Sequence, residues 1–387
     1  MAVKRDKRVD HVVLPDAAAL TSARWFAGKG RDIARLEHVG GLAPEGAAGA
    51  SIEFMDVVYD SGDRERYALA LRDGRECAGD DPLWVALGRA VSVEAAPVTS
   101  RFLAEDLSNT VVSLDDRLVL KLFRRLEPGR HPEAEVLGAL GGFQQVPALV
   151  GVVEYEDITV ALVEEYVAGA PVGWEGLIKR LASGDDVLGD ARDLGHVAAA
   201  LHSELGAALG TRVGDKRDVG DERALATAAL AEFGISPAID TRLAWLDRVI
   251  GTRLQRVHGD LHVGQVLRTT RGLVVIDFEG DPSLPLAARS RERSPLVDLA
   301  SLLLSLDHAA CAAARREPAF DWRAWSFEAR ATCLSAYEES AGEVDRELLR
   351  GFEVAKELRE LVYASRWLPE WLYAPTAVLP TLLEDRA

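Results

Sequence analysis

The sequence predicts an α+β protein with a strand-rich first part and a mostly helical second part. Up to about residue 167, short runs of β-branched and aromatic residues alternate with polar turns; Ile52 to Val58 and Tyr67 to Arg72 flank one such turn. From about residue 168, apolar residues recur at helical spacing, as between Leu194 and Leu205. A length of 387 residues exceeds one typical core, which also favours more than one domain.

These signals divide the chain into three segments. Residues 1–95 are expected to form a separate α+β unit, which the resemblance described below implies is an N-terminal cap with a subdomain, and residues 96–167 to complete the strand-rich part. Residues 168–387 are expected to form the helical part. The elements expected in the middle segment are strands at Thr110–Leu114, Arg117–Phe123, Val150–Tyr155 and Thr159–Tyr166, and a helix at Pro132–Leu140.

Composition and charge narrow the class of protein. The net charge of −17 argues against nucleic-acid binding, which needs clustered Lys and Arg. An acidic surface attracts cationic ligands weakly, although it is equally typical of a protein that simply stays in solution. Cys77, Cys311 and Cys333 lack the spacing of metal ligands, so we expect buried free thiols in a reducing compartment.

The sequence also argues against a membrane protein. The charged N-terminus is not followed by the apolar stretch of a signal peptide. The most apolar run, Leu296 to Ala314, contains Asp298, Asp307 and His308, so we expect a buried helix rather than a membrane span. The expected protein is cytoplasmic and monomeric or a small homo-oligomer, without membrane or nucleic-acid partners.

The segment Gln255 to Gln265 and the acidic cluster after it carry the clearest chemistry. Kinase-type phosphoryl transfer needs an aspartate for the acceptor hydroxyl, an amide for Mg²⁺, and a second aspartate that bridges the metal and the ATP phosphates. Asp260 fits the first role, and Gln265 offers an amide oxygen where such loops usually carry Asn. Asp277 follows an apolar strand and fits the third role, with Glu279 as a further metal contact. The alternative is a solvated acidic loop.

His258 and His262 are four residues apart, which invites a metal site. No third ligand is near in the sequence, and Gly259 disfavours the helix that such a pair of ligands needs. We therefore expect His258 to support the loop by hydrogen bonding, and leave the role of His262 open.

Lys121 lies within an apolar strand, Leu118 to Phe123. A buried lysine must be paired or bound to an anion, so Lys121 is a candidate for binding the α- and β-phosphates of ATP. Glu133 and Glu135 on the following helix are both candidate partners, and helical spacing does not choose between them. The alternative is a lysine whose ammonium reaches the surface.

Two weaker signals concern the nucleotide. The segment Ser108, Asn109 and Thr110 precedes a strand and offers backbone N–H groups for phosphate. At the end of the last strand before residue 168, the backbone at Glu165 and Val167 is placed to hydrogen-bond adenine. Neither segment has a glycine-rich signature, so both predictions rest on position alone.

Together these motifs resemble the aminoglycoside-phosphotransferase-like kinase superfamily, and more closely its actinobacterial maltokinase and glucosamine kinase group. The resemblance covers nearly the whole chain. It implies a bilobal protein-kinase-like fold with an N-terminal cap, a β-rich small lobe and a helical large lobe. Its carriers are Arg24 to Gly30, Ser108 to Thr110, Leu120 to Gly129, His258 to His262 with Gly264 and Gln265, and Asp277 to Gly280.

The resemblance also implies roles for single residues. Asp260 is expected to be the catalytic aspartate, and Gln265 and Asp277 the metal ligands. Lys121 is expected to be the phosphate-binding lysine, paired with Glu135. Asp298 is expected to brace the catalytic loop, and ATP with Mg²⁺ to be the cofactors.

The acceptor implied by the resemblance is a sugar. Glu357, Glu360, Tyr363 and Trp367 recur at helical spacing, so they are expected to share one face of a helix. Carboxylates and aromatic rings together suit a sugar, especially one that carries an ammonium group. The alternative is a core-facing aromatic stripe beside solvated acids. The candidate sugar-binding residues are Asp260, His262, Glu357, Glu360, Tyr363, Trp367, Glu370 and Trp371.

The segment Arg366 to Trp371 departs from the Asn-Arg-Pro-Asp-Trp pattern of maltokinases, which favours the glucosamine kinase branch. The expected reaction is ATP- and Mg²⁺-dependent phosphorylation of D-glucosamine to glucosamine 6-phosphate. The alternatives are a maltokinase that forms maltose 1-phosphate and a pseudokinase-like regulator that binds nucleotide or sugar. A protein kinase is disfavoured, because no long activation segment separates Asp277 from Pro295.

Overall fold

The computed structural model describes residues 14–23, 25–92, 96–104, 108–171, 174–233, 237–281 and 284–384. The N-terminal residues 1–13, and Arg24 at the start of the motif Arg24 to Gly30, lie outside the described residues. The chain divides into two compact units, the first comprising Met1–Gly141 with Pro147–Val167, and the second Gly142–Val146 with Ala168–Ala387. Sheets dominate the first unit and helices the second, which confirms the predicted α+β class. The predicted division of the first unit at residue 95 remains a prediction.

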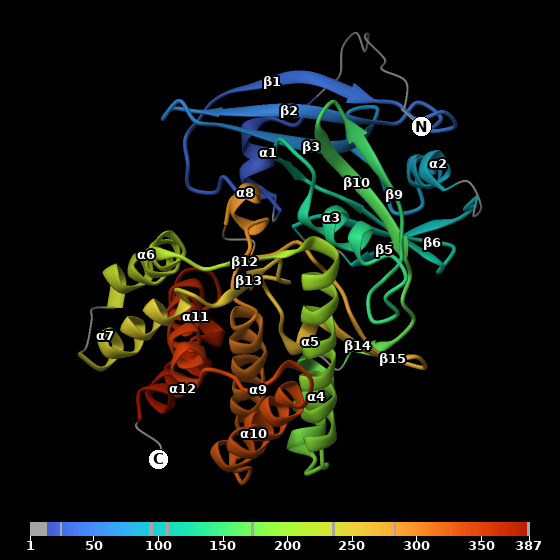
Figure 1. Ribbon diagram of the computed structural model, residues 1–387. Coiled ribbons are helices and arrows are strands. Elements are labelled where there is room, and N and C mark those ends of the chain that lie inside the picture. Colours follow the sequence, from blue (N-terminus) through green and yellow to red (C-terminus); the bar gives the residue numbers. More distant parts are fainter. Residues whose placement is uncertain are drawn as a thin grey trace. The chain divides into compact units, whose positions relative to one another are not determined.

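The first unit opens with an antiparallel sheet whose strands follow one another in sequence order (Figure 1). Strand β1 was not predicted, because its glycines and charged residues interrupt the period-two pattern of a strand. Helix α1 precedes the sheet, and α2 follows it with Asp81 as N-cap. The elements are α1 (Ala17–Ser22), β1 (Ile33–Leu42), β2 (Ser51–Tyr59), β3 (Arg64–Arg72), β4 (Arg75–Glu76) and α2 (Pro82–Val91), with β8 (Arg125–Leu126) paired to β3.

The described part of the Arg24 to Gly30 motif is a packed turn of this unit. The Phe26 side chain is 2% exposed, and its ring centroid lies 5.2 Å from that of Tyr67. A Cβ atom at Gly28 would lie 2.0 Å from the hydroxyl of Tyr59, so only glycine fits there. The described part of the motif therefore contributes to the core of the first unit.

The second sheet of the first unit has the strand order β5-β6-β7-β10-β9. The predicted hairpin, the two later strands and the helix are confirmed within one or two residues. Leu120 and Leu122 are fully buried on β7, so Lys121 lies between two apolar neighbours on this strand. The elements are β5 (Ser100–Ala104), β6 (Thr110–Leu114), β7 (Leu118–Leu122), α3 (Pro132–Ala139), β9 (Leu149–Tyr155) and β10 (Ile158–Glu165).

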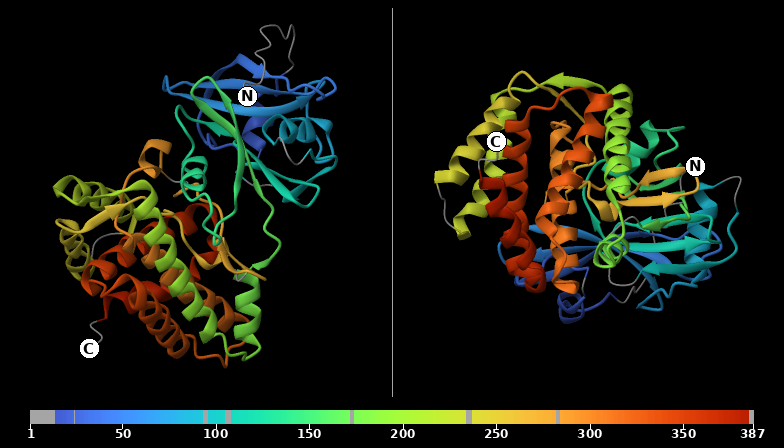
Figure 2. Two further views of the ribbon diagram at one scale, coloured as in Figure 1. Left: turned by 45° about the vertical axis from the view of Figure 1, so that its right-hand side comes forward. Right: turned by 90° about the horizontal axis from the view of Figure 1, so that it is seen from below.

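The second unit is a bundle of helices around α9, which packs against α10 and α11 (Figure 2). Helices α5 and α10 can approach closely because residue 195 of α5 is a glycine. A Cβ atom at that position would lie 2.1 Å from the carbonyl oxygen of Cys333 on α10. The helices are α4 (Trp174–Ala182), α5 (Leu188–Leu209), α6 (Lys216–Phe233), α7 (Pro237–Ala244), η1 (Trp245–Val249), α8 (Leu286–Arg289), α9 (Leu296–Arg316), α10 (Trp322–Ala341), α11 (Arg346–Trp367), η3 (Pro369–Trp371) and α12 (Tyr373–Leu383).

Short strands interrupt the helices around the segment Gln255 to Gln265. One small sheet has the order β11-β14-β15, and a second pairs β12 with β13. Their bounds are β11 (Ala170–Pro171), β12 (Thr211–Val213), β13 (Arg253–Gln255), η2 (Val263–Gln265), β14 (Val266–Thr269) and β15 (Gly272–Val275). The motif loop leaves β13, and the hairpin of β14 and β15 returns the chain to Asp277.

Helix α9 contains the apolar run. Among the described residues it is the one helix long and apolar enough to cross a membrane, and 89% of its apolar window is buried, as in a core helix. Its polar residues have partners on neighbouring helices: Arg330 of α10 donates to Asp307 at 2.7 Å, and His308 donates to Glu357 of α11 at 2.9 Å. The three cysteines are free and buried, as predicted.

Candidate active site

Asp298 at the start of α9 holds the loop that begins at His258. Its two carboxylate oxygens accept hydrogen bonds from the backbone N–H groups of His258 at 2.7 Å and Gly259 at 2.8 Å. Gly259 has φ of 88°, a conformation that favours glycine and turns the chain toward Asp298. Burial alone would raise the pKa of Asp298, but the hydrogen bond from His202 and the positive charge near it hold that pKa below its ordinary value.

His258 supports the same loop from its side chain. Its Nε2 atom donates to the carbonyl of Ile276 at 3.0 Å, and its Nδ1 atom accepts from the backbone N–H of Asp260 at 3.3 Å. The ring thus joins the loop that carries Asp260 to the end of the hairpin that carries Asp277. His262 does not share this contact; its Nδ1 atom caps η2 by accepting from Gly264.

Gln265 and Asp277 lie side by side. The side-chain nitrogen of Gln265 donates to a carboxylate oxygen of Asp277 at 2.9 Å, and a backbone hydrogen bond from Ile276 to Gln265 fixes the two segments together. Asp277 has φ of 70°, whereas the other non-glycine residues with positive φ among the described residues lie in turns. A strained backbone of this kind typically persists where function requires a fixed side-chain direction.

These residues fit a hard divalent cation. One carboxylate oxygen of Asp277 and one of Glu279 lie within 4.8 Å of each other. The side-chain nitrogen of Gln265 is directed to Asp277, so its carbonyl oxygen is the atom suited to a metal. Carboxylate and amide oxygens are the donors that Mg²⁺ prefers.

Asp260 is in contact with a lysine that sequence reasoning missed. The Nζ atom of Lys356 on α11 lies 3.2 Å from Oδ1 of Asp260 and 2.9 Å from Oε1 of Glu360. Burial opposes the charged ammonium, but the two carboxylates outweigh it and raise the pKa of Lys356. The same pairing lowers the pKa of Glu360 despite its burial. The only sequence signal was a lysine placed four residues before Glu360 on the predicted helix.

A buried acid and a group of aromatic rings adjoin these residues. Burial raises the pKa of Glu357, which is 0% exposed and bonded to His308. Trp174 lies 6.4 Å from the ring of His308, 6.1 Å from that of His262 and 5.6 Å from that of Trp371. We call Trp174, His262, His308 and Trp371 the aromatic cluster. Trp174 is far from the others in sequence, and no local pattern marked it.

Three predicted sugar-site residues are not brought into this cluster. Tyr363 is 52% exposed and Trp367 is 59% exposed, and within the described chain neither makes a ring contact with the cluster. Glu370 is exposed on η3. Tyr363 lies about 120° around the helix from Glu357 at 3.6 residues per turn, at the edge of the predicted face. A role of these three residues in sugar binding stays a prediction.

In the first unit, Lys121 is paired with Glu133 rather than with the predicted Glu135. Its Nζ atom lies 2.6 Å from Oε1 of Glu133 and 3.8 Å from Oε1 of Glu164. Glu133 is 0% exposed and faces the sheet, whereas Glu135, two residues later, is rotated by about 200° around the helix axis and is half-buried. Lys121 is therefore buried and paired. The alternative, in which its ammonium group reaches the surface, does not hold.

The other predicted nucleotide residues lie at or near the ends of β6 and β10 in the same sheet. Asn109 accepts a hydrogen bond from the backbone of Arg124, and the Thr110 side chain is buried. Ser108 is exposed in the loop before β6. Glu165 ends β10 and accepts from the backbone of Ala148 at 3.3 Å. Val167 is the last residue of the first unit.

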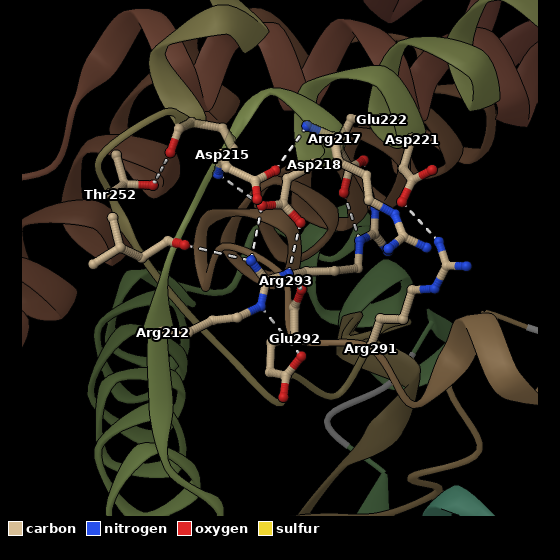
Figure 3. Close-up of polar contacts among 12 residues, drawn as sticks. Arg212, Asp215, Arg217, Asp218, Asp221, Glu222, Thr252, Arg291, Glu292 and Arg293 are labelled. Atoms are coloured by element: carbon tan, nitrogen blue, oxygen red, sulfur yellow. Dashed lines mark hydrogen bonds and ion pairs between the residues drawn. The ribbon is translucent and has the colours of Figure 1, made fainter.

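An ion-pair cluster fixes the segment that connects Asp277 to α9 (Figure 3). Arg293 makes two hydrogen bonds to Glu222 of α6, at 2.6 and 2.7 Å, and both side chains are about nine-tenths buried. Its backbone also pairs with Gln255 at the end of β13. Around this pair, Arg291 contacts Asp221 and Arg212 contacts Asp218. Helix α6 thereby holds β13, the strand from which the loop of His258 to Gln265 departs.

This site and fold define a phosphotransferase. The profile of the phosphotransferase enzyme family matches residues 99–352, and that of the maltokinase N-terminal cap domain matches residues 20–87. The first match spans more than half of the chain, which therefore belongs to the phosphotransferase enzyme family.

The relatives narrow the class to sugar phosphorylation. A glucosamine kinase of Streptacidiphilus jiangxiensis is 34% identical over 335 residues, which cover 76% of this chain and 75% of the relative. A glucosamine kinase of Mycolicibacterium smegmatis is 31% identical over 313 residues, covering 72% and 78%. A solved glucosamine kinase in complex with glucosamine, ADP and inorganic phosphate superposes with a TM-score of 0.69 and 27% identity, covering 96% of this chain and all of the other. The chain is thus an enzyme that transfers phosphate to a sugar hydroxyl and uses a nucleotide.

Proposed function

We propose that this enzyme transfers the γ-phosphoryl group of ATP to D-glucosamine in a Mg²⁺-dependent reaction and forms glucosamine 6-phosphate. The observation that carries the proposal is the carboxylate of Glu357. It is fully buried, and its Oε2 atom has no hydrogen-bond partner among the described residues. A buried acceptor without a donor is costly, so a ligand that supplies an N–H or O–H donor is favoured there.

The neighbours of Glu357 favour an amino sugar. Glu360 lies one turn further along α11, and two carboxylates on one face suit an ammonium group. The rings of Trp174 and Trp371 suit the C–H face of a pyranose, which is apolar. A neutral disaccharide would gain less from this acidic group, which ranks glucosamine above maltose.

The transfer step assigns a role to each catalytic group. The sugar hydroxyl oxygen forms a bond to the γ-phosphorus while the bond to the bridging oxygen of ADP breaks, and the hydroxyl proton passes to Asp260. Because the transition state is loose, Asp260 acts mainly by orienting the hydroxyl. Gln265, Asp277 and Glu279 would hold Mg²⁺, and a metal bound there would supply positive charge to balance the phosphates.

The first unit supplies the nucleotide contacts in this proposal. Lys121, held by Glu133, binds the α- and β-phosphates, and the backbone of Ser108 to Thr110 donates to phosphate oxygens. The backbone at Glu165 and Val167 hydrogen-bonds adenine. Each of these contacts is a proposal that nucleotide-affinity measurements on variants can test.

A panel of acceptors tests the proposal. Purified protein with ATP and Mg²⁺ should consume ATP with glucosamine, far more slowly with glucose or N-acetylglucosamine, and the product should carry phosphate on the 6-hydroxyl by NMR. N-acetylglucosamine is the sharpest comparison, since it differs in the charge of the nitrogen. Nucleotide binding without turnover of any sugar would contradict the proposal and favour a pseudokinase.

Maltose is the second candidate, because the chain carries a maltokinase N-terminal cap domain. Turnover of maltose with formation of maltose 1-phosphate, and none of glucosamine, would establish this reaction instead. The same panel therefore decides between the two sugars.

A further inference from the structure

We propose that Lys356 is a positioning residue that fixes the carboxylate of Asp260 for the acceptor hydroxyl and ties it to Glu360. This inference deepens the proposed function and rests on the role given there to Asp260. It concerns a residue on the last long helix of the chain, 96 positions after the catalytic loop.

The geometry is that of a bridge with one cation and two carboxylates. Nζ of Lys356 lies 3.2 Å from Oδ1 of Asp260 and 2.9 Å from Oε1 of Glu360. The Lys356 side chain is 17% exposed, and those of Asp260 and Glu360 are 24% and 33% exposed. Ion pairs shielded from water to this degree are less screened than surface pairs and keep a defined geometry.

The bridge leaves one oxygen of Asp260 for catalysis. Lys356 occupies Oδ1, and the other carboxylate oxygen, Oδ2, makes no hydrogen bond within the described part of the chain. The backbone of Asp260 is held separately, by His258. Backbone and side chain are thus fixed from two directions, and Oδ2 is the atom that can accept the hydrogen of a sugar hydroxyl.

The charges around Lys356 explain why a cation is needed there. The groups that face it are Asp260, His262 and Asp281 from the loops, and Glu360 and Arg359 on α11 itself. Without Lys356, Asp260 and Glu360 would both lose the cation that lies between them. The Asp260 side chain would then lose the contact that fixes its direction and could rotate away.

The inference predicts a loss in turnover rather than in binding. Lys356 acts on the orientation of Asp260, and misplacement of a catalytic group by about 1 Å can cost about 100-fold in rate. The Michaelis constants for ATP and sugar should change little by comparison, because Lys356 contacts neither directly in this scheme.

The test compares Lys356→Met and Lys356→Arg with a control from the same helix, Arg346→Met, which removes the ion pair of Arg346 with Glu338. We expect the methionine variant to lose about 10- to 100-fold in kcat, with Michaelis constants within about threefold of wild type. Lys356→Arg should recover most of the activity, and Arg346→Met should behave as wild type.

Several results would overturn the inference. Wild-type kcat in Lys356→Met would show that Lys356 does not position Asp260. A rise confined to the Michaelis constant of the sugar would make it a sugar-binding residue instead. If the methionine variant does not fold, Lys356→Gln provides the same readouts. Asp260→Asn separates the two proposals, because an active Asp260→Asn variant would refute the catalytic role of Asp260 itself.

Discussion

The side-chain nitrogen of Gln265 donates a hydrogen bond to Asp277 at 2.9 Å, which joins two residues that the chain separates by a β-hairpin. Because the nitrogen of Gln265 is used in this contact, its carbonyl oxygen and a carboxylate oxygen of Asp277 are the two hard donors of the pair that are suited to a metal. The backbone hydrogen bond from Ile276 to Gln265 keeps the two segments in register.

This pair gives a first prediction about the metal. Asp277→Asn should lower kcat by at least about 1,000-fold, since in the proposed function this carboxylate would hold the metal. Gln265→Ala should raise the Mg²⁺ concentration needed for half-maximal activity about tenfold, with partial recovery at high Mg²⁺. Activity measured across a Mg²⁺ titration checks both effects. An unchanged Mg²⁺ dependence in both variants would remove this pair from the metal site.

A second prediction separates the two glutamates of α3. Glu133→Gln should raise the Michaelis constant for ATP about tenfold or more, because Lys121 loses its 2.6 Å partner and its position. Glu135→Gln, the matched control, should have a much smaller effect. Steady-state kinetics with varied ATP and saturating sugar provide the measurement. Equal effects of the two substitutions would mean that the Lys121–Glu133 pair has no special part in nucleotide binding.

A third prediction concerns the two tryptophans near the end of α11. Trp371→Ala should raise the Michaelis constant for the sugar about tenfold, because it removes a ring of the aromatic cluster. Trp367→Ala should change it less than about threefold, since that side chain is 59% exposed and lies outside the cluster. The comparison uses glucosamine as the varied substrate. A larger effect of Trp367→Ala than of Trp371→Ala would instead support the sugar-binding face that helical spacing predicted.

A fourth prediction tests the anchor between α6 and the segment before α9. Glu222→Gln should lower the free energy of unfolding of the second unit by about 3 kcal/mol, because Arg293 stays buried without its anionic partner. Asp221→Asn, which affects the half-exposed pair with Arg291, should cost less than about 1 kcal/mol. Chemical denaturation followed by tryptophan fluorescence measures both. Similar costs would show that burial of the Arg293 pair has little energetic consequence.

A fifth prediction concerns acid stability. The pKa of Asp298 is lowered in the folded protein below its ordinary value of 3.8, chiefly because hydrogen bonding and charge from His202 outweigh the effect of burial. Its contribution to stability is therefore fully present above the unfolded-state pKa and is lost as the pH falls through the lower folded-state pKa. Asp298→Asn should destabilise the protein at pH 7 and less so near pH 3. Denaturation curves at the two pH values provide the measurement, and an equal loss at both would contradict this linkage.

The sequence by itself determined much of the local structure and chemistry. The hairpin at Asp115 and Asp116, helix α3 and the buried helix α9 follow from hydrophobic periodicity and turn residues, and the structure has them within a few residues. The run from His258 to Gln265 also carried its own signal, because phosphoryl transfer needs particular residue types at short, fixed spacing.

Tertiary structure decided which side chains meet. It selected Glu133 over Glu135 as the partner of Lys121, brought Lys356 to Asp260, and placed Trp174 beside Trp371 while it left Trp367 exposed. Such choices depend on how helices and strands pack, and a rotation of one residue along a helix changes the direction of a side chain by about 100°. Spacing along the chain can therefore name the candidate groups of a site, whereas only packing between distant elements selects the partners that fix their charge and orientation.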